Sequence, residues 1–330
     1  MGRDMKRGVH VLLAFTAFLL IIASWTGPSW GQARIPRVGI VTVGSTADFL
    51  VPFYQTLREH GWVEGKNVAF EYRNASGDPT RIAEPVTELV RLRVNVLFAV
   101  GPATVRAAFG ATREIPIVAH DFESDPVASG YVRTLARPGG NLTGFFLDAP
   151  ELAGKWLEVL KAIAPTVSRV AVVRDPTAGL VQLDAVRKAA PAFGIKVVQV
   201  LEVNTPEDID KLPSAFNERP QALVMLPSPM IWEQSERLAH ITTKSRLPSV
   251  SMFTRFVEAG GLVAYGPDVP GTFEICAALV AKILSGAKPG DLPVEQTTKF
   301  EVPVNLKTAK NLHLTVPDTV LVRATEVISK

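Results

Sequence analysis

A short apolar run near the start of the chain, Arg37-Val38-Gly39-Ile40-Val41, resembles a second run, Arg169-Val170-Ala171-Val172-Val173. Both runs are rich in β-branched residues, and in each half of the chain such runs alternate with longer amphipathic stretches. This alternation predicts βαβ units that build a parallel sheet. The recurrence of the run predicts two lobes of the same design.

Two further pairs of runs follow in the same order along the chain. Residues 95–102 resemble residues 221–228, and residues 115–118 resemble residues 247–250. The first and third pairs are separated by 132 positions (38 to 170 and 116 to 248), and the middle pair by 126 (97 to 223). Ordered pairs at nearly constant separation support a repeated lobe more strongly than any one pair, since buried strands are generally Val-rich.

The predicted elements cover most of the two halves. We expect strands at residues 38–43, 68–72, 94–100, 115–119 and 141–147, and helices at 48–60, at 80–91 and from 103. In the second half we expect strands at 169–173, 196–201, 222–226 and 248–252, and helices at 179–193, 206–216 and 231–244.

Residues 1–33 have the layout of a secretory signal. Basic residues within the first seven positions precede an apolar run at 9–23, and small residues stand at Gly31 and Ala33 before a plausible cleavage site. The apolar run is shorter than the roughly 20 residues that cross a bilayer, which favours a cleaved signal over a membrane anchor. We expect export and cleavage after Ala33, with Gly31 as the alternative.

The composition argues against several function classes. The formal net charge of +3 falls to about +1 without the signal, which leaves no electrostatic footprint for nucleic acid. The single Cys276 cannot form an internal disulfide, and we expect it in the core. The sequence contains no nucleophile elbow, no zinc-protease helix motif and no P-loop, and its five histidines lack metal-ligand spacing. We therefore expect neither catalysis, nor a cofactor, nor a metal.

Five motifs occur in order along the chain: GWVEGKNV at 61–68, RPGGNLTG at 137–144, FVEAGGLVAYGP at 256–267, LPVEQTTKF at 292–300 and NLKTAK at 305–310. Together they resemble the ABC transporter substrate-binding protein family, which includes binders of tryptophan and other aromatic amino acids. The resemblance implies a type I periplasmic-binding fold, a periplasmic location and an ABC permease in the inner membrane as partner.

The expected architecture is therefore α/β, with two Rossmann-like lobes on parallel sheets and a hinge that the chain crosses three times. We assign residues 34–148 and 270–286 to the N-terminal lobe, and residues 149–269 and 287–330 to the C-terminal lobe. We expect a monomer that closes around a small-molecule ligand, which the permease then recognises.

The ligand site is expected where the carboxyl ends of the parallel strands meet. Small and hydroxyl residues stand where strands turn into helices, and backbone N–H groups at helix N-termini bind anions such as a carboxylate. The same hydroxyls could instead only cap their helices. The residues in question are Ser45, Thr46, Gly101 and Thr104.

Acidic and aromatic residues complete the predicted site. Asp121 and Asp175 could pair with an ammonium group, whereas Asp268 is better interpreted as a helix N-cap. Phe122, Phe253 and Tyr265 could stack on a ring, and Tyr265 is also a hinge candidate. His120 and Ser228 belong to loops expected at the same mouth.

The resulting hypothesis is a solute-binding component of an ABC importer that captures an amino acid or related carboxylate. The loops at Asp175 and Ser228 depart from the asparagine-containing loops of the better-described family members, which argues against transferring a tryptophan-like ligand. Two alternatives stay open: a periplasmic sensor that presents its ligand to a membrane receptor, and an exported enzyme, for which only His120, Asp121 and Glu123 come close to a titratable cluster.

Overall fold

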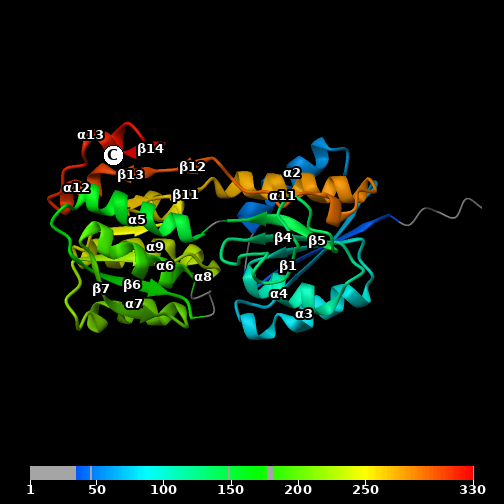
Figure 1. Ribbon diagram of the computed structural model, residues 1–330, viewed down its shortest axis with the longest axis horizontal. Coiled ribbons are helices and arrows are strands. Elements are labelled where there is room, and N and C mark those ends of the chain that lie inside the picture. The colour runs from blue at the N-terminus through cyan, green and yellow to red at the C-terminus, as the bar shows by residue number, and fades with distance from the viewer. Residues whose placement is uncertain (1–34, 45–46, 148, 177–180, 330) are drawn as a thin grey trace, which may run out of the picture. The chain divides into compact units, whose positions relative to one another are not determined.

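The computed structural model describes residues 35–44, 47–147, 149–176 and 181–329 (Figure 1). Contacts within the chain join Pro36–Lys330 into one compact unit. The predicted signal, with both Gly31 and Ala33, lies outside the described residues. None of the helices in the described ranges combines the length and the apolar character that crossing a bilayer would require.

A parallel sheet forms from the first half of the chain, in the order β2-β1-β3-β4-β5. Its strands are β1 (Arg37–Thr42), β2 (Ala69–Asn74), β3 (Val96–Val100), β4 (Ile117–Asp121) and β5 (Leu142–Phe146). The connecting helices are α2 (Ala47–Glu59), α3 (Ala83–Arg91) and α4 (Pro102–Ala111). We call this sheet with its helices the first lobe.

A second sheet has the order β14-β13-β10-β9-β8-β6-β7 and defines the second lobe. Its strands are β6 (Arg169–Arg174), β7 (Lys196–Glu202), β8 (Ala222–Met225), β9 (Ser249–Ser251), β10 (Val263–Ala264), β13 (Pro303–Asn305) and β14 (Glu326–Ile328). Its helices are α5 (Ala149–Ile163), α6 (Val181–Ala189), α7 (Pro206–Ala215), α8 (Pro229–Glu233), α9 (Ser235–Lys244), α10 (Thr254–Glu258), α12 (Leu306–Asn311) and α13 (Asp318–Leu321).

The predicted α/β class with two strand–helix sheets is confirmed, with one departure. Strand β13 runs antiparallel to β10, so the second sheet is mixed. The reason lies just outside the sheet, where β11 (Gly266–Pro267) pairs antiparallel with β12 (Phe300–Glu301). The chain leaves the second lobe along β10 and β11 and returns to it along β12 and β13, which together form one antiparallel ribbon. Strand β13 therefore enters the second sheet antiparallel to β10.

Two predicted helices differ in detail from the structure. The helix expected at 80–91 begins with a separate 3-10 turn, Pro79–Arg81, because the Asp78 side chain accepts the backbone N–H of Thr80. The helix expected at 231–244 is divided into α8 and α9 at Gln234. This break determines where α8 ends, and α8 borders the candidate site described below.

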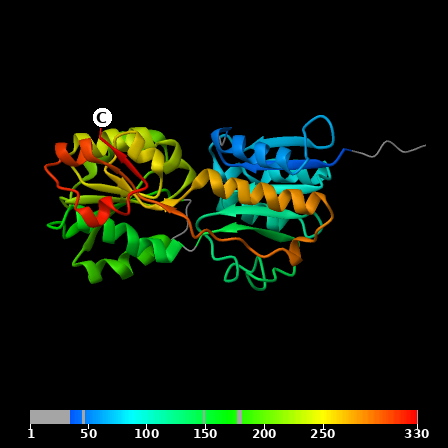
Figure 2. The ribbon, with the colours of Figure 1, turned by 90° about the horizontal axis from the view of Figure 1, so that it is seen from above.

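Helix α11 (Val269–Leu284) follows β11 of the antiparallel ribbon and packs on the first lobe, against α2 and strands β3, β4 and β5 (Figure 2). Its Phe273 ring stacks on Phe49 with a centroid distance of 5.2 Å and meets Phe98 edge-on at 5.8 Å. The helix is N-capped by Asp268, whose side chain accepts the N–H of Gly271, as expected. Cys276 lies in the buried core.

The segment after α11 also stays with the first lobe before it crosses back. Strand β5 is an edge strand, and its backbone groups pair with this segment: Phe146 N–H donates to the Glu295 carbonyl at 3.1 Å, and Glu295 N–H to the Gly144 carbonyl at 2.8 Å. The Thr143 hydroxyl donates to the Leu292 carbonyl at 2.9 Å. An unpaired edge is costly, which explains why residues 287–295, predicted for the second lobe, lie on the first. The other lobe boundaries stay predictions.

Phe98 tests how far the first lobe depends on this aromatic core. The ring is 0% exposed and stacks on Phe53 at a centroid distance of 4.5 Å. We expect Phe98→Ala to lower the free energy of unfolding by about 3–5 kcal/mol, because the cavity adds to the lost burial.

Chemical denaturation of the exported form gives this value, with Val322→Ala as control. Val322 is 86% exposed, so its truncation should change the stability by about 0.5 kcal/mol or less. Equal effects of the two substitutions would contradict the packing described.

Candidate functional site

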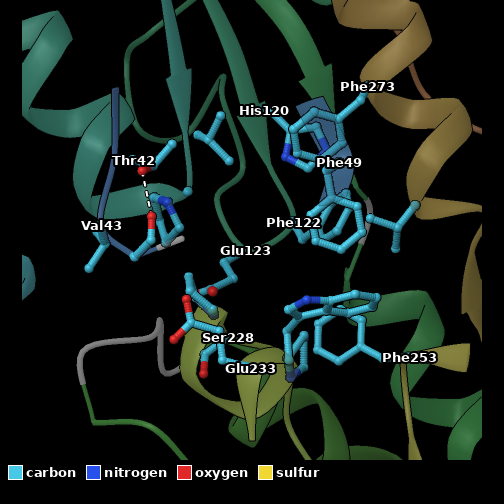
Figure 3. Close-up of a pocket in the computed structure, with 18 residues that line it drawn as sticks. Thr42, Val43, Phe49, His120, Phe122, Glu123, Ser228, Glu233, Phe253 and Phe273 are labelled. Atoms are coloured by element: carbon cyan, nitrogen blue, oxygen red, sulfur yellow. Dashed lines mark hydrogen bonds between the residues drawn. The ribbon is translucent and has the colours of Figure 1, made fainter. Parts of the chain in front are cut away.

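The candidate site lies where strands of both sheets end. On the first lobe it is formed by residues that follow β1, β3 and β4, and on the second lobe by residues that follow β8 and β9 (Figure 3). This is the edge at which ligands bind in parallel α/β sheets. We call it the inner pocket, and it is lined by Thr42, Val43, Gly44, Phe49, Val100, Gly101, Pro102, His120, Phe122, Glu123, Pro227, Ser228, Pro229, Trp232, Glu233, Phe253, Val269 and Phe273.

Aromatic side chains from both lobes meet in the inner pocket. The Phe49 ring of α2 approaches the Trp232 ring of α8 edge-on, with a centroid distance of 4.4 Å. Trp232 in turn contacts Phe253 at 5.0 Å. Together with Phe122 and Phe273, these rings form what we call the aromatic wall. Such a surface favours a flat apolar group, which can stack on ring faces and meet ring edges.

Carboxylates line the pocket beside this wall. Glu123 follows β4, and Glu233 ends α8, so each lobe contributes one. Oε1 of Glu233 occupies the space that a side chain at position 44 would need, which shows how closely the two lobes approach here.

A second, more polar pocket continues from the first and shares Glu123 and Glu233 with it. This outer pocket adds Asp78, Asp175 and Asn204. Among the described residues that line the two pockets, none is Lys or Arg. The lining therefore favours a ligand with a positively charged group over one that is only anionic.

The N-terminus of α4 supplies a place for negative charge. Gly101 precedes this helix with φ 90°, a conformation that strains other residues, and its N–H donates to the His120 carbonyl at 2.8 Å. Among the residues that the structure describes, no side chain caps α4, and Pro102 and Ala103 line the outer pocket. The first-turn N–H groups and the helix dipole are thus available to an anion such as a carboxylate.

His120 is the polar ring within the aromatic wall. Its centroid lies 4.3 Å from that of Phe273 and 4.6 Å from that of Phe122. Its Nε2 is 2.8 Å from the hydroxyl of Thr272, on α11. Burial lowers the pKa of His120 to about 3, because the charged ring would lose its hydration. The imidazole is therefore neutral at physiological pH.

The structure brings some of the predicted ligand residues together. Gly101, His120, Phe122, Ser228 and Phe253 line the inner pocket, and Asp175 lines the outer one. The Ser228 hydroxyl also accepts the Ile231 N–H at 3.1 Å and so N-caps α8. Ser45 and Thr46 lie outside the described residues, so their predicted role stays a prediction.

Three predicted ligand residues do not line either pocket. Thr104 is fully buried within α4. Asp121 is buried too, and its Oδ1 accepts the N–H of Glu123 at 2.8 Å, so it shapes the loop that carries Glu123. Burial raises the pKa of the Asp121 carboxyl. Tyr265 lies at the crossing between the lobes, where its carbonyl accepts from Trp156 Nε1 at 2.7 Å and its ring stacks on Phe300 at 5.5 Å.

The sequence analysis missed four lining residues. It included Phe49, Trp232 and Glu233 only in predicted helices, and Phe273 only in the segment 270–286. One signal was available for Phe49, Trp232 and Glu233: they lie on helices that directly follow a strand of one of the two sheets. In a parallel α/β sheet this position faces the ligand edge. The pairing of Phe49 with Trp232 could not be found, because it joins elements from different lobes.

The low pKa of His120 makes a testable contribution to stability. The unfolded chain takes up a proton at this ring below about pH 6.5, whereas the folded chain resists protonation down to about pH 3. Stability from this group is therefore lost as the pH falls through that window. Between pH 6.5 and about pH 4.5, we expect the free energy of unfolding to fall by about 2 kcal/mol less in His120→Asn than in the parent protein.

Denaturant titrations across this pH range measure the difference. His240→Asn is the control, since His240 is exposed on α9 and its substitution should leave the pH profile of the parent unchanged. If the free energy of unfolding had the same pH dependence in His120→Asn and in the parent, the His120 ring would be hydrated in the folded protein, which would contradict its burial.

Known proteins with a similar sequence or structure include binding proteins for aromatic amino acids. A tyrosine-binding protein from Clostridioides difficile (strain R20291) is 23% identical over 266 residues, which cover 79% of this chain and 75% of that protein. A conserved domain protein from Vibrio cholerae is 27% identical with a TM-score of 0.80, over 89% of this chain and all of that one. A domain from Streptococcus pneumonia in complex with L-Trp is 22% identical with a TM-score of 0.79, over 89% and 99%.

The family resemblance that the five motifs indicated is confirmed by a match along nearly the whole chain. The sequence profile described as "ABC transporter substrate binding protein" matches residues 41–328. Members of this family are binding proteins and not enzymes, so the exported-enzyme alternative is set aside. The chain belongs to the ABC transporter substrate-binding protein family.

Proposed function

We propose that this protein captures an aromatic amino acid between its lobes and delivers it to the permease of an ABC importer. The observation that carries the proposal is the composition of the pocket, in which an aromatic wall, carboxylates from both lobes and the N-terminus of α4 border one space. These are the partners that the ring, the ammonium group and the carboxylate of such a ligand require.

The aromatic wall supplies the binding energy for the ring. Burying an aromatic side chain removes about 150–250 Å² from water, which is worth roughly 4–6 kcal/mol before the costs of association. Because Phe49 and Phe122 come from the first lobe and Trp232 and Phe253 from the second, a ring among them contacts both lobes. Such a ligand favours the arrangement in which the lobes approach one another.

The polar partners orient the ligand. Glu123 and Glu233 can pair with its ammonium group, and Asp175 extends the acidic lining outward. The first turn of α4, next to Gly101, can receive its carboxylate. The tyrosine-binding relative and the L-Trp complex support an aromatic amino acid. They also outweigh the loop departures that argued against a tryptophan-like ligand from sequence.

The family supports the proposed transport role and location. Its members serve ABC transporters, which supports an inner-membrane permease as partner and the periplasm as the site of capture. No observation favours the alternative of a sensor that signals to a membrane receptor.

Thermal unfolding of the exported form, refolded to remove bound solutes, tests the ligand class. A ligand at 100 times its Kd stabilises the folded state by about 2.7 kcal/mol, which corresponds to a rise in Tm of roughly 5 °C or more for a protein of this size. We expect this rise with L-tyrosine or L-tryptophan and not with aliphatic amino acids or sugars.

A matched pair of variants identifies the pocket as the binding site. Glu233→Gln removes a carboxylate from the lining and should reduce the rise in Tm at the same ligand concentration. Glu236→Gln makes the same charge change on α9, outside both pockets, and should leave the rise intact. Stabilisation by sugars alone, or equal effects of the two variants, would contradict the proposal.

A further inference from the structure

We propose that the first lobe carries a basic face, at the edge of its sheet away from the pocket, that binds bilayer surfaces containing anionic phospholipids. The inference does not depend on which solute the pocket takes. It follows from the excess of basic side chains at this edge, from the apolar residues among them, and from the place of this edge in the chain.

The amino ends of parallel strands gather at one edge of a sheet, and the carboxyl ends at the other. All strand pairs of the first lobe are parallel, so the segments that lead into β1 to β5 lie at the edge opposite the pocket. Helix α11 ends there too, and Gly139 N–H donates to the Gly290 carbonyl at 3.0 Å. We call this edge the basal face and define it by residues 36–37, 58–66, 91–95, 112–116, 133–141 and 282–291.

Hydrogen bonds join neighbouring segments of the basal face. Asn95 N–H donates to the Arg37 carbonyl at 2.8 Å, and Arg37 N–H donates to the side-chain oxygen of Asn95 at 2.8 Å. The side-chain amide of Asn141 donates to the Ile115 carbonyl at 2.8 Å. The basic side chains of these segments therefore stand on one continuous surface.

The basal face has a large excess of positive charge. Its segments contain ten Lys and Arg and four Asp and Glu, which leaves 25 and 28 of the 35 and 32 in the whole chain for all other positions. All ten basic residues are exposed, and none forms an ion pair within the part of the chain that the structure describes. Such a concentration of charge on one face attracts an anionic surface.

Helix dipoles account for a minority of these cations. A basic residue in the last turn of a helix complements its negative end, and Arg58, Arg91 and Lys282 stand in the last turns of α2, α3 and α11. The other seven basic residues lie outside the α-helices, where this effect falls off. Their charge is therefore available to a binding partner.

Apolar residues among the cations favour a lipid surface over other polyanions. Trp62 and Val63 are half-buried in the first of the five motifs, GWVEGKNV. Tryptophan is enriched at membrane–water interfaces, and a bilayer surface accepts apolar and basic groups together. Strand β1 begins at the basal face (Figure 1). This face is therefore the first part of the folded domain to follow the predicted signal, which enters the membrane during export.

Co-sedimentation of the exported form with vesicles measures this binding. We expect the protein to bind vesicles of phosphatidylcholine and phosphatidylglycerol at low salt. Binding should be lost at high salt, which screens exposed charges, and with phosphatidylcholine alone. Arg91→Gln combined with Arg93→Gln should weaken the binding by about tenfold or more, because each basic residue near an anionic surface strengthens it severalfold.

A matched pair of substitutions on the second lobe is the control. Lys244 ends α9 and Arg246 follows it with φ 53°, just as Arg91 ends α3 and Arg93 follows it with φ 49°. All four residues are exposed. Lys244→Gln combined with Arg246→Gln thus removes the same charge in the same local structure and should leave vesicle binding nearly unchanged. Unaltered Tm values show that both variants are folded.

Three results would overturn the inference: no binding to the anionic vesicles, equal binding with and without phosphatidylglycerol, or equal losses in the two paired variants. Duplex DNA is the second probe, and tighter binding of DNA than of the vesicles would assign the face to nucleic acid and overturn the inference too. The rise in Tm with an aromatic amino acid should be the same in Arg91→Gln/Arg93→Gln as in the parent, so the inference and the proposed function can fail separately.

Discussion

The packing of α11 against the first lobe is the contact on which the rest of the structure depends. This helix begins directly after β11 of the antiparallel ribbon, and its Phe273 completes an aromatic core with Phe49 and Phe98. Its N-cap, Asp268, also forms an ion pair with Lys299 on the returning chain, at 2.8 Å. The helix thus joins the core of one lobe to the crossing between both, and its first turn forms part of the pocket.

This arrangement explains why the pocket combines apolar and charged surfaces. The buried core of the first lobe reaches the strand ends through Phe49 and Phe273, and the second lobe places Trp232 opposite them. The carboxylates stand beside these rings, on the loop after β4 and at the end of α8. Asp121 and Thr272 do not reach the ligand space, yet one shapes the loop of Glu123 and the other orients His120.

The sequence was sufficient for the fold and for part of the site. Periodicity and repeated runs predicted the strands, because the apolar residues that a strand buries follow one another directly in the sequence. Residues such as His120 and Phe122 were predicted for the site because they lie at the end of a predicted strand, and both line the inner pocket. Contacts between distant segments were not predicted, because no local sequence pattern encodes them. Residues 287–295 cover the edge of β5, and Phe49 contacts Trp232. Thr104 is buried within α4, because a hydroxyl at a helix start can face inward as well as outward.

A crystal structure of the exported protein with bound L-tyrosine tests the central claim most directly. The account predicts the ring of the ligand within the aromatic wall and its ammonium group beside Glu123 and Glu233. A ligand bound outside the inner pocket, or one with its ammonium group at His120 and its ring among the carboxylates, would contradict it.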